Sequence, residues 1–379
     1  MTRRERLMAT LRGEAVDRPA VSFYEVGGFT VDPSDPDPFN IYNSPSWQPL
    51  LRLAEEKTDL IRMVGPALAP APGNRRGEFI TEEAWEGEGS RFRRTTVRVA
   101  GRTLTSVSRR DPGTDTTWTT EHLLKDADDL CAYLELPDEV FDVVADIRPL
   151  VDAEAKVGDA GILMVDTGDA LAEGAALFSM DDFMVLAFTE KALFHKLLEK
   201  LAAPIQRTVE RVAREFPGRL WRIYGPEYAA EPYLPSRLFN EFVVRYDQPL
   251  VQAIEGNGGF CRIHCHGRVK AVLPAIVEMG ASAIDPLEPL PQGDVTLAEV
   301  RREFGKDLVL FGNLEASDLE NLEPAEFAPL VDRALEEGTS GEGRGFVLMP
   351  SASPYGRDIT RRTMANYETM VEKAAGRAR

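Results

Sequence analysis

Residues 260–270 read Phe-Cys-Arg-Ile-His-Cys-His-Gly-Arg-Val-Lys, and they hold two of the four histidines and two of the three cysteines of the chain. The apolar start of this stretch predicts a short buried strand at residues 261–265. Because successive side chains of a strand point to opposite faces, we expect His264 and His266 on one face and Cys265 on the other. Two neighbouring imidazoles suit a divalent metal held by nitrogen ligands, or a hydrogen-bonded histidine pair at a strand end.

Short apolar runs of the same kind recur along the chain, separated by stretches with helical periodicity. They predict eight buried strands, at residues 20–24, 60–64, 162–165, 220–224, 261–265, 283–284, 308–311 and 346–349. A helix precedes the first strand and helices follow the others, which matches a (β/α)8 TIM barrel better than a doubly wound sheet with its smaller number of strands.

The chain also contains a segment of different character between the second and third predicted strands. Residues 73–120 alternate Thr, Arg and Val, which predicts an antiparallel β-ribbon inserted into the barrel. Helical periodicity returns at residues 126–136 and 141–156, and again at 181–215 with expected breaks near Thr189 and Pro204. We therefore expect one barrel domain over residues 1–379 that carries the ribbon.

Composition narrows the classes of function. The chain has 44 Lys and Arg residues and 62 Asp and Glu residues, which gives a formal net charge of −18. This charge opposes binding to nucleic acid or to anionic membranes, although a local basic pocket remains compatible with it. There is no run of about 18 apolar residues, no secretory signal and no disulfide framework in the three cysteines. We expect a cytoplasmic protein.

In a (β/α)8 barrel the active site lies at the carboxyl ends of the strands, so the residue after each apolar run is a candidate for chemistry. Nearly every predicted strand is followed by a polar residue, although a carboxylate there can also cap the next helix. The candidates in chain order are Glu25, Asp166, Asp169, Tyr224, Glu227, His264, His266, Asp285, Glu288, Asn313, Glu315, Ser351 and Ser353. The carboxylates around the two histidines favour a bound cation over a bare anion.

Several motifs together resemble the uroporphyrinogen decarboxylase superfamily over nearly the whole chain. They are Arg-Arg-Glu-Arg-Leu at residues 3–7 with Asp-Arg-Pro at 17–19, Gly-Arg-Thr-Leu at 101–104, Ile-His-Cys-His-Gly at 263–267, Gly-Ala-Ser-Ala-Ile-Asp at 280–285 and Phe-Gly-Asn-Leu at 311–314. The chain is more similar to the branch of corrinoid-linked, zinc-dependent methyltransferases than to the haem-pathway decarboxylase. The resemblance implies a distorted (β/α)8 barrel.

The chain departs from this resemblance at two places. The decarboxylase has an arginine-bearing motif after its first strand, whereas residues 24–29 here read Tyr-Glu-Val-Gly-Gly-Phe. The methyltransferases bind zinc through H-x-C and a distant cysteine, whereas the chain has His264-x-His266 and, at residues 349–354, Met-Pro-Ser-Ala-Ser-Pro. Porphyrinogen decarboxylation is therefore not expected. A metal would need oxygen ligands in place of thiolates, and that set suits activation of water, an alkoxide or a phenolate.

Three functions stay open at this point. The first is a metal-dependent, methyltransferase-like demethylating enzyme that passes a methyl group from a small substrate to a corrinoid carried by a partner protein. The second is a lyase or decarboxylase for a small carboxylic acid, whose carboxylate would pair with an arginine buried beside the histidines. The third is a barrel that binds a small ligand without catalysis. A homodimer is an open alternative for the assembly.

The candidate residues divide by expected role. Those expected in catalysis are Glu25, Tyr224, Glu227, His264 and His266. Those expected to bind substrate are Tyr24, Phe29, Arg62, Asp166, Arg222, Asn313 and Ser351. Those expected to hold zinc or a similar divalent metal are His264, His266, Glu227, Asp285 and Glu288. If His266 and His264 instead act without metal, they would serve as acid and base.

Overall fold

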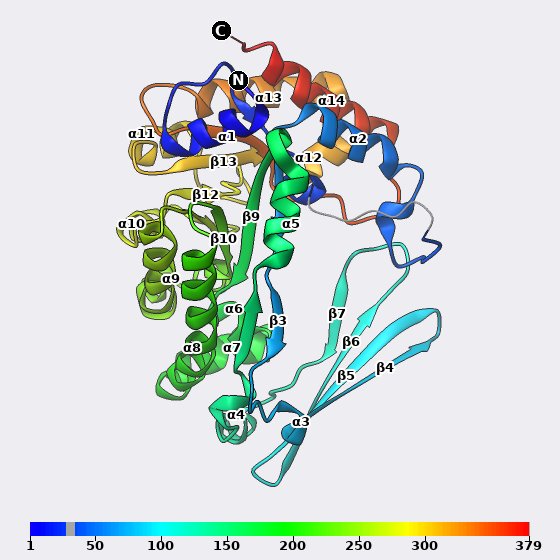
Figure 1. Cartoon of the computed structure of the whole chain (residues 1–379), viewed down its shortest axis with the longest axis vertical. Helices are drawn as coiled ribbons and strands as arrows, with labels where there is room; N and C mark the ends of the chain where they lie inside the picture. The colour runs from blue at the N-terminus through cyan, green and yellow to red at the C-terminus, as the bar shows by residue number, and fades with distance from the viewer. Residues whose placement is uncertain (28–34, 379) are drawn as a thin grey trace.

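The computed structural model describes residues 1–27 and 35–378, and its centre is a curled sheet of eight parallel strands (Figure 1). The order is β1-β14-β13-β12-β11-β10-β9-β2. The strands are β1 (Ala20–Val21), β2 (Leu60–Val64), β9 (Gly161–Gly168), β10 (Leu220–Tyr224), β11 (Phe260–His264), β12 (Ala283–Asp285), β13 (Val309–Leu314) and β14 (Phe346–Pro350). Each predicted strand is present, and the predicted (β/α)8 barrel is confirmed.

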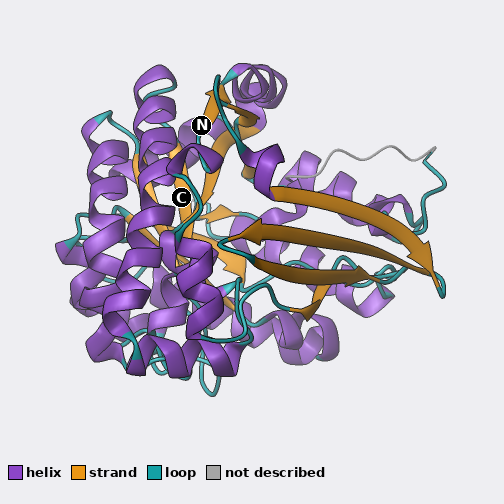
Figure 2. Cartoon of the chain, turned by 90° about the horizontal axis from the view of Figure 1, so that it is seen from below, coloured by secondary structure: helices purple, strands orange, loops and turns teal. Residues whose placement is uncertain are grey.

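Helices lie between the strands and cover the outside of the barrel (Figure 2). They are α1 (Arg3–Arg12), α2 (Trp47–Lys57), α4 (Ala127–Leu134), α5 (Arg148–Val157), α6 (Ala170–Ala175), α7 (Met180–Thr189), α8 (Lys191–Glu215), α9 (Arg245–Gly256), α10 (Leu273–Glu278), α11 (Leu297–Phe304), α12 (Ala316–Asn321), α13 (Pro324–Gly338) and α14 (Arg361–Ala375). The short helix α3 (Arg76–Phe79) belongs to the inserted segment instead (Figure 1). The expected break falls between α7 and α8, but α8 continues through Pro204. Its buried apolar stripe offsets the cost of about 3 kcal/mol for an internal proline.

Asp59 joins the two end strands of the sheet, β1 and β2. Its backbone N–H donates to the carbonyl of Val21 at 2.8 Å, and its carboxylate accepts the N–H of Val21 at 2.9 Å. The carboxylate is fully buried between the guanidinium groups of Arg6 and Arg18, at 2.6 and 2.7 Å. The first motif of the sequence is therefore structural, because its arginines neutralise the aspartate that links β1 to β2.

The inserted segment forms an antiparallel sheet that projects from the barrel beside β3 (Figure 1). Its strands are β4 (Ile80–Gly87), β5 (Ser90–Val99), β6 (Arg102–Arg110) and β7 (Thr117–Glu121), so the predicted ribbon is confirmed. A separate antiparallel pair joins β3 (Ala67–Pro70) to β8 (Val143–Asp146). The helix predicted at residues 141–156 is wrong for β8, because pairing with β3 overrides the local periodicity, and only α5 is helical there.

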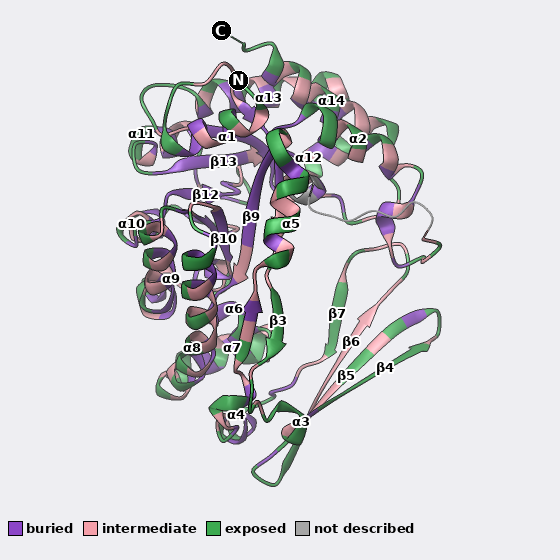
Figure 3. Ribbon diagram, in the orientation of Figure 1, coloured by how far each residue is buried: buried purple, intermediate pink, exposed green. Residues whose placement is uncertain are grey.

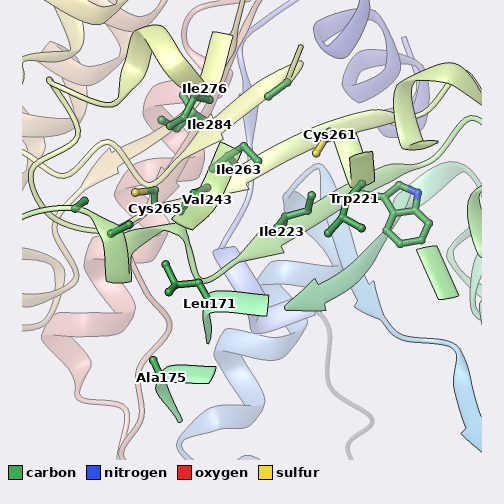
Figure 4. Close-up of a cluster of buried hydrophobic side chains, with 14 of the residues drawn as sticks. Leu171, Ala175, Trp221, Ile223, Val243, Cys261, Ile263, Cys265, Ile276 and Ile284 are labelled. Carbon is green, nitrogen blue, oxygen red and sulfur yellow. The ribbon is translucent and has the colours of Figure 1, made fainter. Parts of the chain in front are cut away.

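Two hydrophobic clusters lie on opposite faces of the barrel strands, and the strands are the most deeply buried part of the chain (Figure 3). The inner cluster includes Met164, Phe311 and Met349, whereas the outer cluster lies between the strands and the helices. Cys265 belongs to the outer cluster, beside Val243 and Ile276 (Figure 4). The prediction that Cys265 and His264 start from opposite faces of the strand is confirmed.

No helix in the described ranges, 1–27 and 35–378, is long and apolar enough to cross a membrane.

Candidate active site

The candidate site lies where four neighbouring strands end at the same level. Gly168 of β9 is paired with Tyr224 of β10, Tyr224 with His264 of β11, and His264 with Asp285 of β12. Gly168 leaves room for the ring of Tyr224, because a Cβ at position 168 would lie 3.0 Å from that ring. Parallel register therefore brings together residues that are far apart in the chain at the carboxyl end of the barrel, where (β/α)8 enzymes have their active sites.

Asp285 fixes the orientation of His264. The Nδ1 atom of His264 lies 2.9 Å from Oδ2 of Asp285, and both side chains are buried. Burial would raise the pKa of Asp285, but the charges of Arg262 and His264 outweigh it and lower the pKa to about 2. The ionised carboxylate can only accept, so Nδ1 of His264 carries the proton and donates it. The other ring nitrogen, Nε2, is the atom of His264 that faces Tyr24.

Arg262 lies behind Asp285 inside the barrel. Its Nε atom is 2.9 Å from Oδ1 of Asp285, although the two atoms are not aligned for a hydrogen bond. The guanidinium also stacks over the ring of Phe311 at 5.0 Å and lies 3.9 Å from the Met349 sulfur. Only 1% of Arg262 is exposed, so the charge of Asp285 compensates a cation that water cannot reach.

A second ion pair reaches His264 from the other side through Tyr24. Arg222 donates from Nε and Nη2 to the two carboxylate oxygens of Asp166, at 2.6 and 3.2 Å. Its Nη1 donates to the hydroxyl of Tyr24 at 2.7 Å. That hydroxyl also lies 3.4 Å from Nε2 of His264, so Tyr24 links Arg222 to the histidine. Tyr24 has φ of 51°, a strained backbone of the kind that clusters at functional sites.

His266 follows the end of β11 and pairs with a different carboxylate. Its Nδ1 lies 2.8 Å from Oε1 of Glu288, whose Oε2 accepts the backbone N–H of Gly267 at 2.7 Å. The rings of His264 and His266 are perpendicular, with centroids 4.5 Å apart. Burial would lower the pKa of His266, but Glu288, with help from the charges of Glu227 and Asp285, raises it above the usual value. The side chain is 37% exposed.

Ser351 and Glu315 form the side of the site next to β13 and β14. The Ser351 hydroxyl donates to Oε1 of Glu315 at 3.2 Å and accepts the backbone N–H of Ala316 at 3.0 Å. Burial and the charge of Glu288 raise the pKa of Glu315, and its Oε2 has no hydrogen-bond partner among the described residues. Ser351 thus positions a carboxyl group near the His266–Glu288 pair.

The histidines do not gather a preformed set of metal ligands. Among residues 1–27 and 35–378, no three His, Cys, Asp or Glu side chains are grouped so that they could hold a metal ion. The reason is that the carboxylates of Asp285 and Glu288 point at the Nδ1 atoms of the two histidines. Only the Nε2 atoms then remain as possible metal ligands in this pair. A closed zinc site therefore does not fit the described donors, and metal binding stays a prediction.

The remaining predicted residues are placed as follows. Glu25 belongs to the 3-10 helix Tyr24–Gly27, and its side chain, like the whole of Phe29, lies outside the described residues. Arg62 starts from the face of β2 opposite to the inner residues Ile61 and Met63 and lies 3.5 Å from Glu55.

Three further predicted residues lie at the strand ends. Burial raises the pKa of Tyr224 to about 12, so it stays a neutral phenol. The Glu227 carboxylate accepts the N–H of Gly225 at 3.1 Å. Asn313 is half-buried in β13. These three residues lie at or just after the carboxyl ends of β10 and β13, and their expected roles stay predictions.

Two arrangements were missed from the sequence. One is the pairing of Arg262 with Asp285, because strand parity places Arg262 on the face of His264 but does not show which carboxylate lies next to it. The other is the pair of buried carboxyl groups of Asp169 and Asp247. Burial raises the pKa of both, and for Asp169 the charge of Asp247 adds to the effect. No sequence signal marks Asp247, because it lies within α9.

Comparison with known proteins finds solved structures that are similar to the chain and one family model that matches it. The matching solved structures include a methyltransferase from Methanosarcina mazei, with a TM-score of 0.63 and 15% sequence identity over 99% of each chain. Another is the mannanase BCman of Bacillus subtilis, with a TM-score of 0.41 and 10% identity over 95% of this chain and 88% of that one. No curated protein sequence matches the chain significantly. The model of the family described as uroporphyrinogen decarboxylase (URO-D) matches residues 168–363, more than half of the chain, which therefore belongs to this family.

Proposed function

We propose that this protein is a methyltransferase-like enzyme that demethylates a small neutral or cationic substrate. Membership of the URO-D family and the fold shared with a methyltransferase support the class of enzyme. The observation that supports the substrate class is the pairing of charges in the barrel mouth. Arg222 is held by Asp166 and Arg262 by Asp285, so neither cation is left over for a substrate carboxylate.

The surroundings of the histidines favour a substrate without negative charge. Glu288 and Glu315 lie on one side of His266, and the rings of Tyr24 and Tyr224 lie on the side of Arg222. Carboxylates repel an anion and attract a cation, and aromatic faces bind methylated ammonium groups. A methylated amine or a methyl ether therefore suits this mouth better than a small acid.

His266 is the proton donor in this proposal. When a methyl group leaves a neutral oxygen or nitrogen atom, that atom gains a negative charge and needs a proton, whereas a methylated ammonium group leaves as a neutral amine and needs none. Glu288 holds Nδ1 of His266 and stabilises the imidazolium, so Nε2 can deliver its proton to the leaving atom. The partly exposed ring can regain the proton from solvent. The methyl group passes to a corrinoid on a partner protein, which supplies the nucleophile.

His264 has a different role, because its Nδ1 proton is committed to Asp285 and its Nε2 faces Tyr24. It holds the Tyr24 hydroxyl in place between two groups, with Arg222 on the other side. Zinc held by the Nε2 atoms of both histidines would take the place of the His266 proton and act as a Lewis acid. No step of the proposal depends on that metal.

The test is methyl transfer to cob(I)alamin from a panel of methylated amines and methoxylated aromatics, followed by the visible spectrum of the cobalamin. We expect the purified protein to transfer methyl from at least one donor, and His266→Gln to reduce the rate by about 100-fold. The matched control is His195→Gln, which removes a histidine of α8 whose partners, Glu241 and Tyr246, belong to the helical segment at residues 240–256 outside the strands. A wild-type rate no higher than that of His266→Gln would refute the proposal.

A second candidate is a lyase for a small carboxylic acid. It is supported by the buried Arg222, whose guanidinium a carboxylate could reach if it displaced Asp166. Release of carbon dioxide from a panel of small acids, lost in Arg222→Lys but not in His195→Gln, would favour this function over methyl transfer.

A further inference from the structure

A cavity of about 410 Å³ lies at the end of the barrel opposite to the histidines. Its walls come from the end of α1, the connection that enters β1 and the loop that enters β14. These are the amino ends of parallel strands, whereas His264 lies at the carboxyl ends. We propose that this cavity is a second ligand site, which binds a small phosphorylated anion.

The charge of the cavity wall is opposite to that of the whole chain. Arg18, Arg301, Arg344 and Arg377 line it, against one carboxylate, Glu14. Because the whole chain has a formal net charge of −18, this cavity is far richer in arginine than the average composition of the chain would give. A cavity walled by one sign of charge concentrates ligands of the other sign.

Two of these arginines lack an acidic partner. Arg18 pairs with Asp59, and Arg377 lies 3.9 Å from Asp332. Within the described residues, no Asp or Glu forms an ion pair with Arg301 or Arg344. Their guanidinium groups donate only to backbone carbonyls, so their charges remain uncompensated.

Arg301 is the stronger indication, because it is 95% buried at the cavity wall. Its Nη atoms donate to the carbonyls of Gly305, Gly338 and Gly345, while Nε has no hydrogen-bond partner. Burial lowers its pKa to about 10, which still leaves it charged at neutral pH. A buried cation without a counter-charge is costly, and an anion in the adjacent cavity would offset that cost.

The loop at residues 338–345, Gly-Thr-Ser-Gly-Glu-Gly-Arg-Gly, is shaped around this guanidinium. A Cβ at Gly343 would collide with Nη1 of Arg301, so only glycine lets the backbone lie against it. Gly345, with φ of 155°, then carries the chain into β14. The glycines thereby place Arg344 at the same wall as Arg301.

Arginine favours phosphate among anions, because its planar donors match two phosphate oxygens at once. The volume lies within the range of about 300–1,000 Å³ typical of small-molecule sites, so a phosphate ester or pyrophosphate fits better than one bare ion. The site shares no residue with the mouth, and the inference is independent of the reaction proposed for the histidines.

The test is calorimetric titration of the full chain with pyrophosphate, inorganic phosphate and a phosphate monoester at constant ionic strength. We expect saturable binding of pyrophosphate or the monoester, weakened at least tenfold in Arg344→Gln. Glu14→Gln should bind more tightly, because it removes the one carboxylate of the wall. Arg52→Gln, which loses the same charge from an exposed position of α2, should bind as the wild type does.

Three results would overturn the inference. One is the absence of saturable binding for all three ligands. Another is an equal loss of affinity in Arg344→Gln and Arg52→Gln, which would mean that only the overall charge matters. Retained affinity in Arg344→Gln together with unchanged affinity in Glu14→Gln would likewise place the ligand elsewhere.

Discussion

The buried ion pair between Arg262 and Asp285 allows a quantitative test of how the site is held together. The perturbations are Asp285→Asn, Arg262→Met and the double variant. Asn keeps the shape of the carboxylate, and Met keeps most of the apolar length of arginine. Both charges are nearly inaccessible to water, at 1% and 0% exposure, so solvent cannot replace the lost partner.

The expected loss of stability can be estimated from the geometry of the pair. At 2.9 Å and an effective dielectric constant of about 20, the attraction is about 6 kcal/mol, which burial of both ions opposes. The pKa of Asp285 falls from 3.8 to about 2, and this net shift corresponds to about 2.5 kcal/mol. We therefore expect Asp285→Asn to lose about 3 kcal/mol of stability, since it leaves Arg262 as an unpaired buried cation.

The direction in which pH changes this contribution to stability is also fixed. The folded pKa of Asp285 is depressed, so its stabilisation is present above the unfolded pKa of about 4 and is lost as the pH falls toward about 2. In Asp285→Asn this part of the acid sensitivity should disappear.

The assay is urea unfolding of the full chain at pH 7, followed by tryptophan fluorescence and extrapolated to water. We expect the double variant to be about 2 kcal/mol more stable than the sum of the single losses predicts, because it leaves no unpaired charge. Strict additivity of the two losses would refute the reasoning, since it would mean that the two charges do not interact.

Three further predictions follow from the same structure. Asp247→Asn should have a higher urea midpoint than the wild type at pH 8 but not at pH 5. Burial raises the pKa of Asp247, so the wild type loses stability as the pH rises toward that folded pKa, and the variant does not. Equal effects at both pH values would contradict this. Tyr24→Phe should lower the turnover rate about tenfold with an unchanged urea midpoint, because it removes the hydroxyl that contacts His264; a shifted midpoint would indicate a structural role instead. The metal site predicted from the sequence is tested by elemental analysis of protein purified without chelator: one equivalent in the wild type and none in His266→Ala would support that prediction against the described geometry, and no metal in either would end it.

Local patterns in the sequence were enough to predict the barrel and the face of each strand on which a side chain lies. Alternation with period two placed His264 inward and Cys265 outward, because this period depends only on the strand backbone. Apolar runs marked β2 and β10 at their observed limits, since a buried parallel strand is apolar throughout. The helix predicted over β8 was wrong because its pairing partner, β3, gives no local signal.

Only the tertiary structure decided which groups meet in the mouth. The contact of Tyr24 with His264 joins residues 240 positions apart, and the pairing of Arg222 with Asp166 spans 56. Such contacts depend on strand register and on side-chain rotamers, which composition and periodicity do not encode. The sequence by itself therefore determined that two histidines stand at the end of β11. The fold decided that Asp285 takes the Nδ1 atom of His264, which leaves Nε2 for chemistry.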